Sequence, residues 1–271
     1  SGEVINLTAS MATETTRATS TDKLQDTQFE SGKSINVEAY KTGEATAYAT
    51  AKYETTDAAG AMSGSITYPA TGEKVDICAY YPDDISSSST SFNVAATQKT
   101  EADYQANDLM YATKLTEKEK GTTHELTFNH ALSKIIVNIE AGTGVTAANI
   151  TSLVSAVKIK NTVLNASLAI SGGTITATKG TGSATDIDIT GSGTSNIGII
   201  VPQTVAANTE FITVTYNNNS YTYKLPTETT FSAGNSYTFT LTLNAASISL
   251  KSASINPWTN HESAGSEDIT L

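Results

Sequence analysis

The side chains best suited to chemistry are three histidines and one cysteine. His124 and His130 lie six residues apart around the start of a predicted strand, and His261 lies near the C-terminus. Six residues is not a common spacing for zinc ligands, so we expect these histidines at strand ends or on the surface. Cys78 lies in an apolar run, residues 75–80, which favours a buried small hydrophobe over a nucleophile.

The acidic residues offer little more. Asp83-Asp84 and the pair Asp186 and Asp188 are the close pairs, and a calcium site would need more carboxylates converging around a glycine turn. We therefore expect solvated acids in loops. Two of the 27 acids could still meet as a glycosidase pair, but aromatic residues make up 7% and there is one Trp, which is little stacking surface for a sugar cleft.

The sequence also lacks a Gly-x-Ser-x-Gly elbow, a His-Glu-x-x-His motif and a P-loop. We predict no enzyme, no cofactor and no metal.

Charge and composition exclude further classes. The net charge is -11 and the pI about 4.7, which argues against nucleic acid and against electrostatic docking on anionic lipid. One cysteine allows no disulfide within the chain. No apolar run reaches 18 residues, so we expect no transmembrane helix. No signal peptide is visible, but Ser1-Gly2 resembles a trimmed or engineered terminus, and we expect a precursor segment upstream.

The first 28 residues combine a strand, a tether and a single arginine. Residues 3–9 are predicted to form one short strand, and residues 10–28 form a Ser/Thr-rich tether with almost no apolar content. Arg17 is the only arginine in the chain. An arginine-specific protease would therefore find one target, and it lies in the tether.

The rest of the chain reads as short strands separated by turns. Strand-like runs include 35–40, 74–81, 134–140, 211–216, 220–225 and 237–243. Asn217-Asn-Asn219 marks a hairpin, and Ser171-Gly172 marks another between 167–170 and 173–177. Helical patterning is confined to a turn within 97–107 and to 145–154.

This pattern predicts an all-β protein with two tandem antiparallel β-sandwich domains. We place the boundary at the glycine-rich segment 141–144, which gives an N-terminal domain of residues 1–141 and a C-terminal domain of residues 142–271.

Several short motifs, in this order and spacing, resemble the fimbrillin-like proteins of Bacteroidetes, the subunits of type V pili. The similarity runs from about Thr16 to Trp258 and rests on Thr16-Arg-Ala18, Ile35-Asn-Val-Glu-Ala-Tyr40, Asp108-Leu-Met-Tyr-Ala112, Phe128-Asn-His-Ala-Leu-Ser-Lys-Ile-Ile136, Val201-Pro-Gln-Thr204, Phe231-Ser-Ala-Gly234 with Tyr237, and Ile255-Asn-Pro-Trp258.

The resemblance implies transthyretin-like, Greek-key sandwiches and a maturation step. Such proteins are exported as lipoproteins to the outer membrane, and an Arg- or Lys-type protease removes an N-terminal strand. Arg17 then matches the cleavage position, and Ala18 the new terminus. A strand from the C-terminal region of a neighbouring subunit fills the vacated groove, which points to residues 247–271. Residues 259–271 form a short appendage, and this leaves a shaft subunit and a tip or accessory subunit both open.

Removing a strand from a sandwich exposes an edge that can recruit another strand. We expect Ile5 and Leu7 to point into the core, with Val4 as a further contact of the removable strand. Apolar residues two apart also mark the candidate donor residues, which are Ile248, Leu250, Ile269 and Leu271.

The predicted function is a structural pilin of a surface fimbrium that polymerises by donor-strand exchange and serves adhesion. Its partners would be copies of itself or related pilins, the processing protease, and a host or bacterial surface receptor. The alternative is a non-polymerising adhesin or glycan-binding sandwich, a tip or accessory subunit, with a site on loop 86–91 or loop 178–193. An extracellular enzyme is the third reading.

Overall fold

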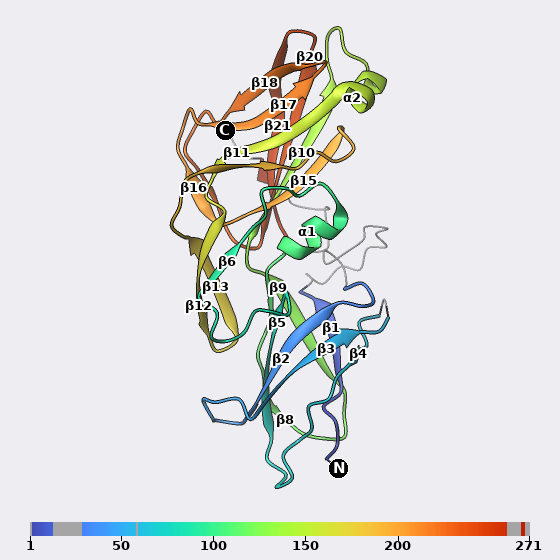
Figure 1. Ribbon diagram of the computed structural model, residues 1–271, viewed down its shortest axis with the longest axis vertical. Helices are drawn as coiled ribbons and strands as arrows, with labels where there is room; N and C mark the ends of the chain where they lie inside the picture. The colour runs from blue at the N-terminus through green and yellow to red at the C-terminus, as the bar shows by residue number, and fades with distance from the viewer. Residues whose placement is uncertain (1, 13–28, 58, 259–266, 269–271) are drawn as a thin grey trace.

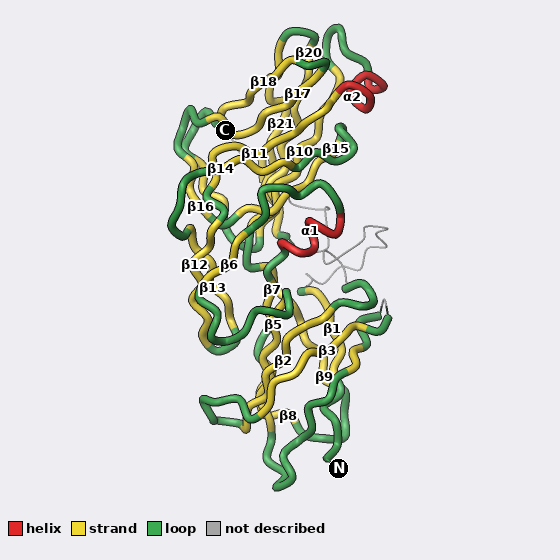
Figure 2. Tube along the Cα trace, in the orientation of Figure 1, coloured by secondary structure: helices red, strands yellow, loops and turns green. Residues whose placement is uncertain are grey.

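The computed structural model describes residues 2–12, 29–57, 59–258 and 267–268. In this part of the chain almost all regular structure is strand, as Figure 2 shows. The two helices are short: α1 (Glu101–Asn107) and α2 (Ala147–Leu153), each beginning at a threonine capping box. The all-β prediction is therefore confirmed.

The N-terminal half is built on one sheet, which forms the lower part of Figure 1. Its strand order is β1 (Leu7–Met11), β9 (His124–His130), β7 (Met110–Ala112), β5 (Val75–Tyr81), β2 (Ser34–Lys41), β3 (Ala49–Thr55) and β4 (Met62–Ser63), with β8 (Leu115–Lys118) beside β5. Every residue of β5 is buried, because core lies against both faces of this strand.

Four smaller sheets form the remainder. The five-stranded sheet has the order β15 (Ser195–Ile200), β10 (Ser133–Ala141), β20 (Asn235–Asn244), β21 (Ser247–Pro257) and β22 (Glu267–Asp268). The four-stranded sheet has β14 (Thr185–Asp188), β11 (Val154–Thr162), β17 (Glu210–Tyr216) and β18 (Asn219–Lys224). The others are β13 (Thr174–Lys179), β12 (Asn165–Ser171) and β6 (Ser91–Asn93), and the pair β16 (Gln203–Val205) and β19 (Thr229–Phe231).

Two strand pairs are parallel, whereas the sequence predicted antiparallel sandwiches. β1 pairs parallel with β9, and β10 pairs parallel with β20. Each pair joins strands that are about a hundred residues apart in the chain. The alternation within one strand sets which face is buried, but it carries no information about the direction of a distant partner.

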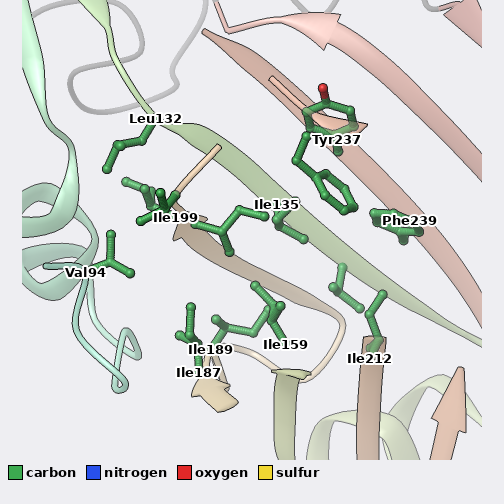
Figure 3. Close-up of a cluster of buried hydrophobic side chains, with 14 of the residues drawn as sticks. Val94, Leu132, Ile135, Ile159, Ile187, Ile189, Ile199, Ile212, Tyr237 and Phe239 are labelled. Atoms are coloured by element: carbon green, nitrogen blue, oxygen red, sulfur yellow. The ribbon is translucent and has the colours of Figure 1, made fainter. Parts of the chain in front are cut away.

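The predicted boundary after residue 141 separates strands that the structure pairs. β10 lies between β15 and β20, so it belongs to the sheet of the C-terminal half. Figure 3 shows Leu132 and Ile135 in the same core as Ile199, Tyr237 and Phe239. The glycine-rich segment that suggested a boundary is a turn within this half, where the Gly142 N–H donates to the Leu243 carbonyl.

The hairpin turns follow from backbone conformations with positive φ. Asn217 and Asn218 have φ of 46° and 62°, which confirms the predicted Asn turn between β17 and β18. Between β12 and β13 the turn residues are Gly172 and Gly173, with φ of 56° and 82°. The predicted loop was one residue too early, because a turn with two positive φ angles needs both glycines.

None of the helices in the described residues is long and apolar enough to cross a membrane.

We predict that Ile135→Ala destabilises the protein by about 2–5 kcal/mol, because Ile135 is fully buried in a central strand and its loss leaves a cavity. Ile197→Ala is the matched control, since this isoleucine in the neighbouring β15 is 37% exposed. We expect the control to cost less than about 1 kcal/mol. Urea unfolding of both variants measures the difference, and equal costs would contradict the assigned core.

Candidate functional site

The N-terminal strand fills the gap between the two ends of its own sheet. On one side β1 pairs with β9 in register from Leu7 opposite His124 to Met11 opposite Phe128. On the other side, antiparallel bridges join Val4 to Thr67 and Thr8 to Ala61. Figure 1 shows β1 among β9, β3 and β4. We call the contacts of residues 3–12 with residues 124–128 and 60–68 the seam.

Backbone hydrogen bonds hold the strand along both edges. Toward residues 60–68, the bonds are Ile5 N–H to Ile66 O at 2.8 Å, Ala9 N–H to Gly60 O at 2.8 Å, and Tyr68 N–H to Glu3 O at 2.9 Å. Toward β9, the ladder is flanked by His124 N–H to Asn6 O at 2.9 Å and Ala12 N–H to Phe128 O at 2.8 Å. Loss of the strand would leave two rows of unpaired backbone groups.

The same strand closes a hydrophobic core. Ile5, Leu7, Ala9 and Met11 are all buried in the cluster of the N-terminal half. Burial of a side chain such as Ile5 or Leu7 contributes roughly 1.5–3 kcal/mol. Val4 is 37% exposed, so its predicted role as a core contact is wrong. Successive side chains in a strand point to opposite faces, and Val4 lies on the face opposite Ile5.

The strand lies further along the chain than the sequence indicated. We predicted residues 3–9, but β1 spans Leu7–Met11 with Val4 in an isolated bridge before it, and Met11 is buried beside Phe128. The described chain resumes at Phe29, whose ring packs edge-on against Phe128 with 4.8 Å between centroids. The described residues on either side of residues 13–28 therefore both contact Phe128. The predicted processing residues Arg17 and Ala18 lie outside the described residues.

Two glycines allow the close packing of the seam. Gly60 has a φ of +87°, and a Cβ on it would clash with the Ala9 carbonyl oxygen. Gly64 lies flat against the ring of Tyr53, where a Cβ would also clash. These two positions bring residues 60–64 against β1 and against the core side chain beneath it.

Tyr53 anchors the strand from inside the core. Its ring is buried and its hydroxyl donates to the Ile5 carbonyl at 2.9 Å. Burial raises the pKa of Tyr53 to about 12, because ionisation would place an oxyanion in an apolar site.

Polar contacts fasten the two ends of the seam. The Gly121 N–H donates to the Glu3 carboxylate at 2.7 Å, and the Ser10 hydroxyl donates to Glu125 at 2.5 Å. At the Glu3 end, the Tyr68 hydroxyl lies 2.8 Å from His124 Nε2. His124 thus supports the edge of β9 where β1 begins to pair.

The candidate donor residues are placed in part. Ile248 and Leu250 lie half-buried in β21, opposite Leu243 and Leu241 of β20. They therefore belong to a resident strand of the five-stranded sheet. Ile269 and Leu271 lie outside the described residues, while the preceding β22 pairs with the far end of β21.

The side chains that suggested chemistry have structural partners. His130 lies at the end of β9, but it is buried and not on the surface, because its Nδ1 bonds to Asp108 at 2.7 Å and its ring stacks on Trp258 at 3.8 Å. Cys78 is buried as predicted, and burial raises the pKa of its thiol. His261 lies outside the described residues.

The close acidic pairs were predicted to lie in solvated loops, and this holds for only some of them. Asp186 and Asp188 lie in β14 and pair with Lys160 at 2.6 Å and Lys99 at 3.1 Å. Asp83 lies outside a strand and pairs with Lys52 at 2.8 Å. In the described part of the chain no three His, Cys, Asp or Glu side chains are grouped so that they could hold a metal ion.

We predict that Gly60→Ala destabilises the seam more than Gly72→Ala does. Both glycines have positive φ, so both variants pay a similar backbone cost, on the order of 1 kcal/mol. Only Gly60 faces the Ala9 carbonyl, whereas Gly72 has open space around it. Amide hydrogen exchange of residues 5–11 should therefore accelerate in Gly60→Ala alone. Equal exchange in the two variants would rule out the close approach.

A second prediction concerns alkaline pH. Tyr53→Phe removes the hydrogen bond to Ile5 and should cost about 1 kcal/mol at pH 8. Because the folded pKa of Tyr53 lies above the ordinary value of 10, its contribution is complete below pH 10 and is lost as the pH rises through about 12. The difference in unfolding free energy between wild type and variant should therefore shrink between pH 10 and 12. A constant difference over this range would show that Tyr53 is not the titrating group.

Comparison with known proteins shows which family and which solved structures this chain is similar to. A family model described as fimbrillin-like matches residues 16–258. A comparison with curated proteins found no match. Among solved structures, a candidate cell adhesion protein of Bacteroides uniformis is 23% identical, with 94% of this chain and 98% of that chain covered and a TM-score of 0.72.

Two further structures share the fold. A candidate cell adhesion protein of Bacteroides ovatus is 17% identical, with 97% and 100% covered and a TM-score of 0.68. The tip fimbrial protein Mfa3 of Porphyromonas gingivalis, solved with a C-terminal truncation, is 10% identical, with 94% and 99% covered and a TM-score of 0.53. The family match covers every described strand except β1 and β22, and the chain belongs to the fimbrillin-like family.

Proposed function

We propose that this protein is a pilin subunit of a cell-surface fimbrium, and that it polymerises by exchanging its N-terminal strand for a strand of a neighbouring subunit. A protease that recognises Arg or Lys cuts after Arg17, so that Ala18 becomes the new N-terminus. Residues 3–12 are then held by the non-covalent contacts of the seam.

The observation that carries the proposal is the two-sided pairing of β1. The strand lies between the ends of its own sheet and buries four side chains, yet its covalent link to the body is the segment 13–28. Once that segment is cut, the strand is attached only by non-covalent contacts, and a strand with similar side chains can take its place.

The incoming strand comes from the C-terminal region of another copy or of a related pilin. Ile248 and Leu250 are already paired with β20, so donating them would break an existing ladder. Ile269 and Leu271 keep the same spacing, and β22 directly before them pairs with β21 through only two residues, so we assign the donor role to them.

Such a subunit is anchored through export as a lipoprotein to the outer membrane, and the assembled fimbrium contacts a host or bacterial surface receptor. The family match supports a surface appendage. The net charge of -11 fits a surface protein that binds other proteins and not nucleic acid.

The test is limited digestion with an arginine-specific protease. We expect a single cut after Arg17, with the N-terminal fragment still bound in native mass spectrometry. Mild warming should then release the fragment and produce oligomers in size-exclusion chromatography, because the open seam accepts a strand from another copy. Arg17→Ala should fold with unchanged stability, resist the protease and stay monomeric.

The results of the digestion distinguish a pilin that exchanges its strand from a non-polymerising adhesin. Cut protein that loses its fragment without losing stability would contradict a structural role for β1. Cut protein that loses stability yet never associates, alone or with related pilins, would favour a non-polymerising adhesin.

A further inference from the structure

We propose that the seam selects its incoming strand by side-chain size, and that the position of Ala9 is the selective one. The pattern is a large aliphatic residue at the positions of Ile5 and Leu7, a small residue at Ala9, and a long residue at Met11. This inference rests on the proposed function and names the kind of strand, from another pilin subunit, that the seam accepts.

The Ala9 position is closed on two sides. Its side chain is 3% exposed and points into the core between those of Leu7 and Met11. A larger side chain in a close-packed core is usually accommodated by a shift of its backbone. At Ala9 such a shift would disrupt backbone pairing on both edges, because Ala9 bonds to Gly60 on one edge and pairs with Leu126 on the other.

The contact with Gly60 is unusually close. The Ala9 N–H donates to the Gly60 carbonyl at 2.8 Å, and the Ala9 carbonyl lies where a Cβ of residue 60 would be. Only a glycine fits on the facing segment, so the two backbones cannot approach further. The strand therefore cannot move toward residues 60–64, and a shift away from the core for a larger residue at this position would disrupt its backbone pairing.

The flanking positions need large residues for separate reasons. Tyr53 donates to the Ile5 carbonyl and fixes the depth of the strand at that end. Met11 lies beside Phe128, where Phe29 also packs. Between them, a residue smaller than Leu7 would leave a cavity.

The order large, large, small, long is not the same when reversed. A strand that entered in the opposite direction would place a leucine at the Ala9 position and an alanine at the Leu7 position. The size pattern thus also selects direction, parallel to β9 and antiparallel to residues 60–67.

The test uses full-length protein cut after Arg17 and three synthetic peptides. The parent peptide is residues 3–12, and two variants carry Ala9→Leu or Asn6→Leu. Asn6 is exposed, so its variant adds the same apolar bulk on the outer face. Displacement of the bound N-terminal fragment is followed by native mass spectrometry.

We expect the parent and Asn6→Leu peptides to displace the fragment at similar concentrations, and Ala9→Leu to need about tenfold more or to fail. Equal displacement by the Ala9→Leu peptide would overturn size selection and leave the exchange mechanism intact. Failure of the parent peptide would overturn strand exchange, and the inference with it.

Discussion

The N-terminal half is held together by the backbone hydrogen bonds that the N-terminal strand makes along both of its edges. Backbone N–H and C=O groups that lose water must find another partner, and residues 60–68 and β9 both find theirs in the same segment, residues 3–12. Main-chain pairing and side-chain burial act together here, since the residues that carry the hydrogen bonds also place Ile5, Leu7, Ala9 and Met11 in the core. Loss of β1 would therefore open a hydrophobic groove and two edges at once.

The protein has two hydrophobic cores, and their arrangement explains how loss of β1 can open the N-terminal half alone. The side chains of β1 belong to the smaller core, whereas the larger core contains β10, β20 and the strands of the C-terminal half. The halves are joined on the other face of the N-terminal sheet. There β6 pairs with β12, and Cys78 of β5 packs close to Gly173 of the β12–β13 turn. A strand that is absent from this joint can leave without separating the halves, because regions with separate cores can open at separate free energies.

Buried polar groups near the contact between the two halves form hydrogen bonds with defined partners. Glu38 is buried and accepts the Ser87 N–H at 3.0 Å, while the Asn36 amide donates to the Ile85 carbonyl at 2.8 Å. His130 and Asp108 meet at 2.7 Å where the chain passes from β9 toward β10. A histidine beside an acid can suggest catalysis, but here the imidazole is enclosed between its carboxylate partner and the Trp258 ring. These packing contacts explain why His130 is buried beside Asp108.

Local pattern was sufficient for many features of this protein. Alternation identified strands such as β5 and β20, and the Asn run identified the β17–β18 turn, because side-chain direction and φ preference are properties of a few neighbouring residues. The burial of Ile5 and Leu7 followed from the same alternation. The lone arginine is likewise a property of the sequence.

The tertiary structure decided everything that depends on distant partners. The parallel pairing of β1 with β9, the place of β10 in the C-terminal half, and the extension of β1 to Met11 arise from contacts across about a hundred residues. No sequence pattern singled out Gly60, yet in the fold it lets a second backbone approach Ala9. The sequence by itself determined that residues 3–9 form a strand with one apolar face. Only the fold decided that this strand closes a sheet from both sides, because an edge exists only where other strands end.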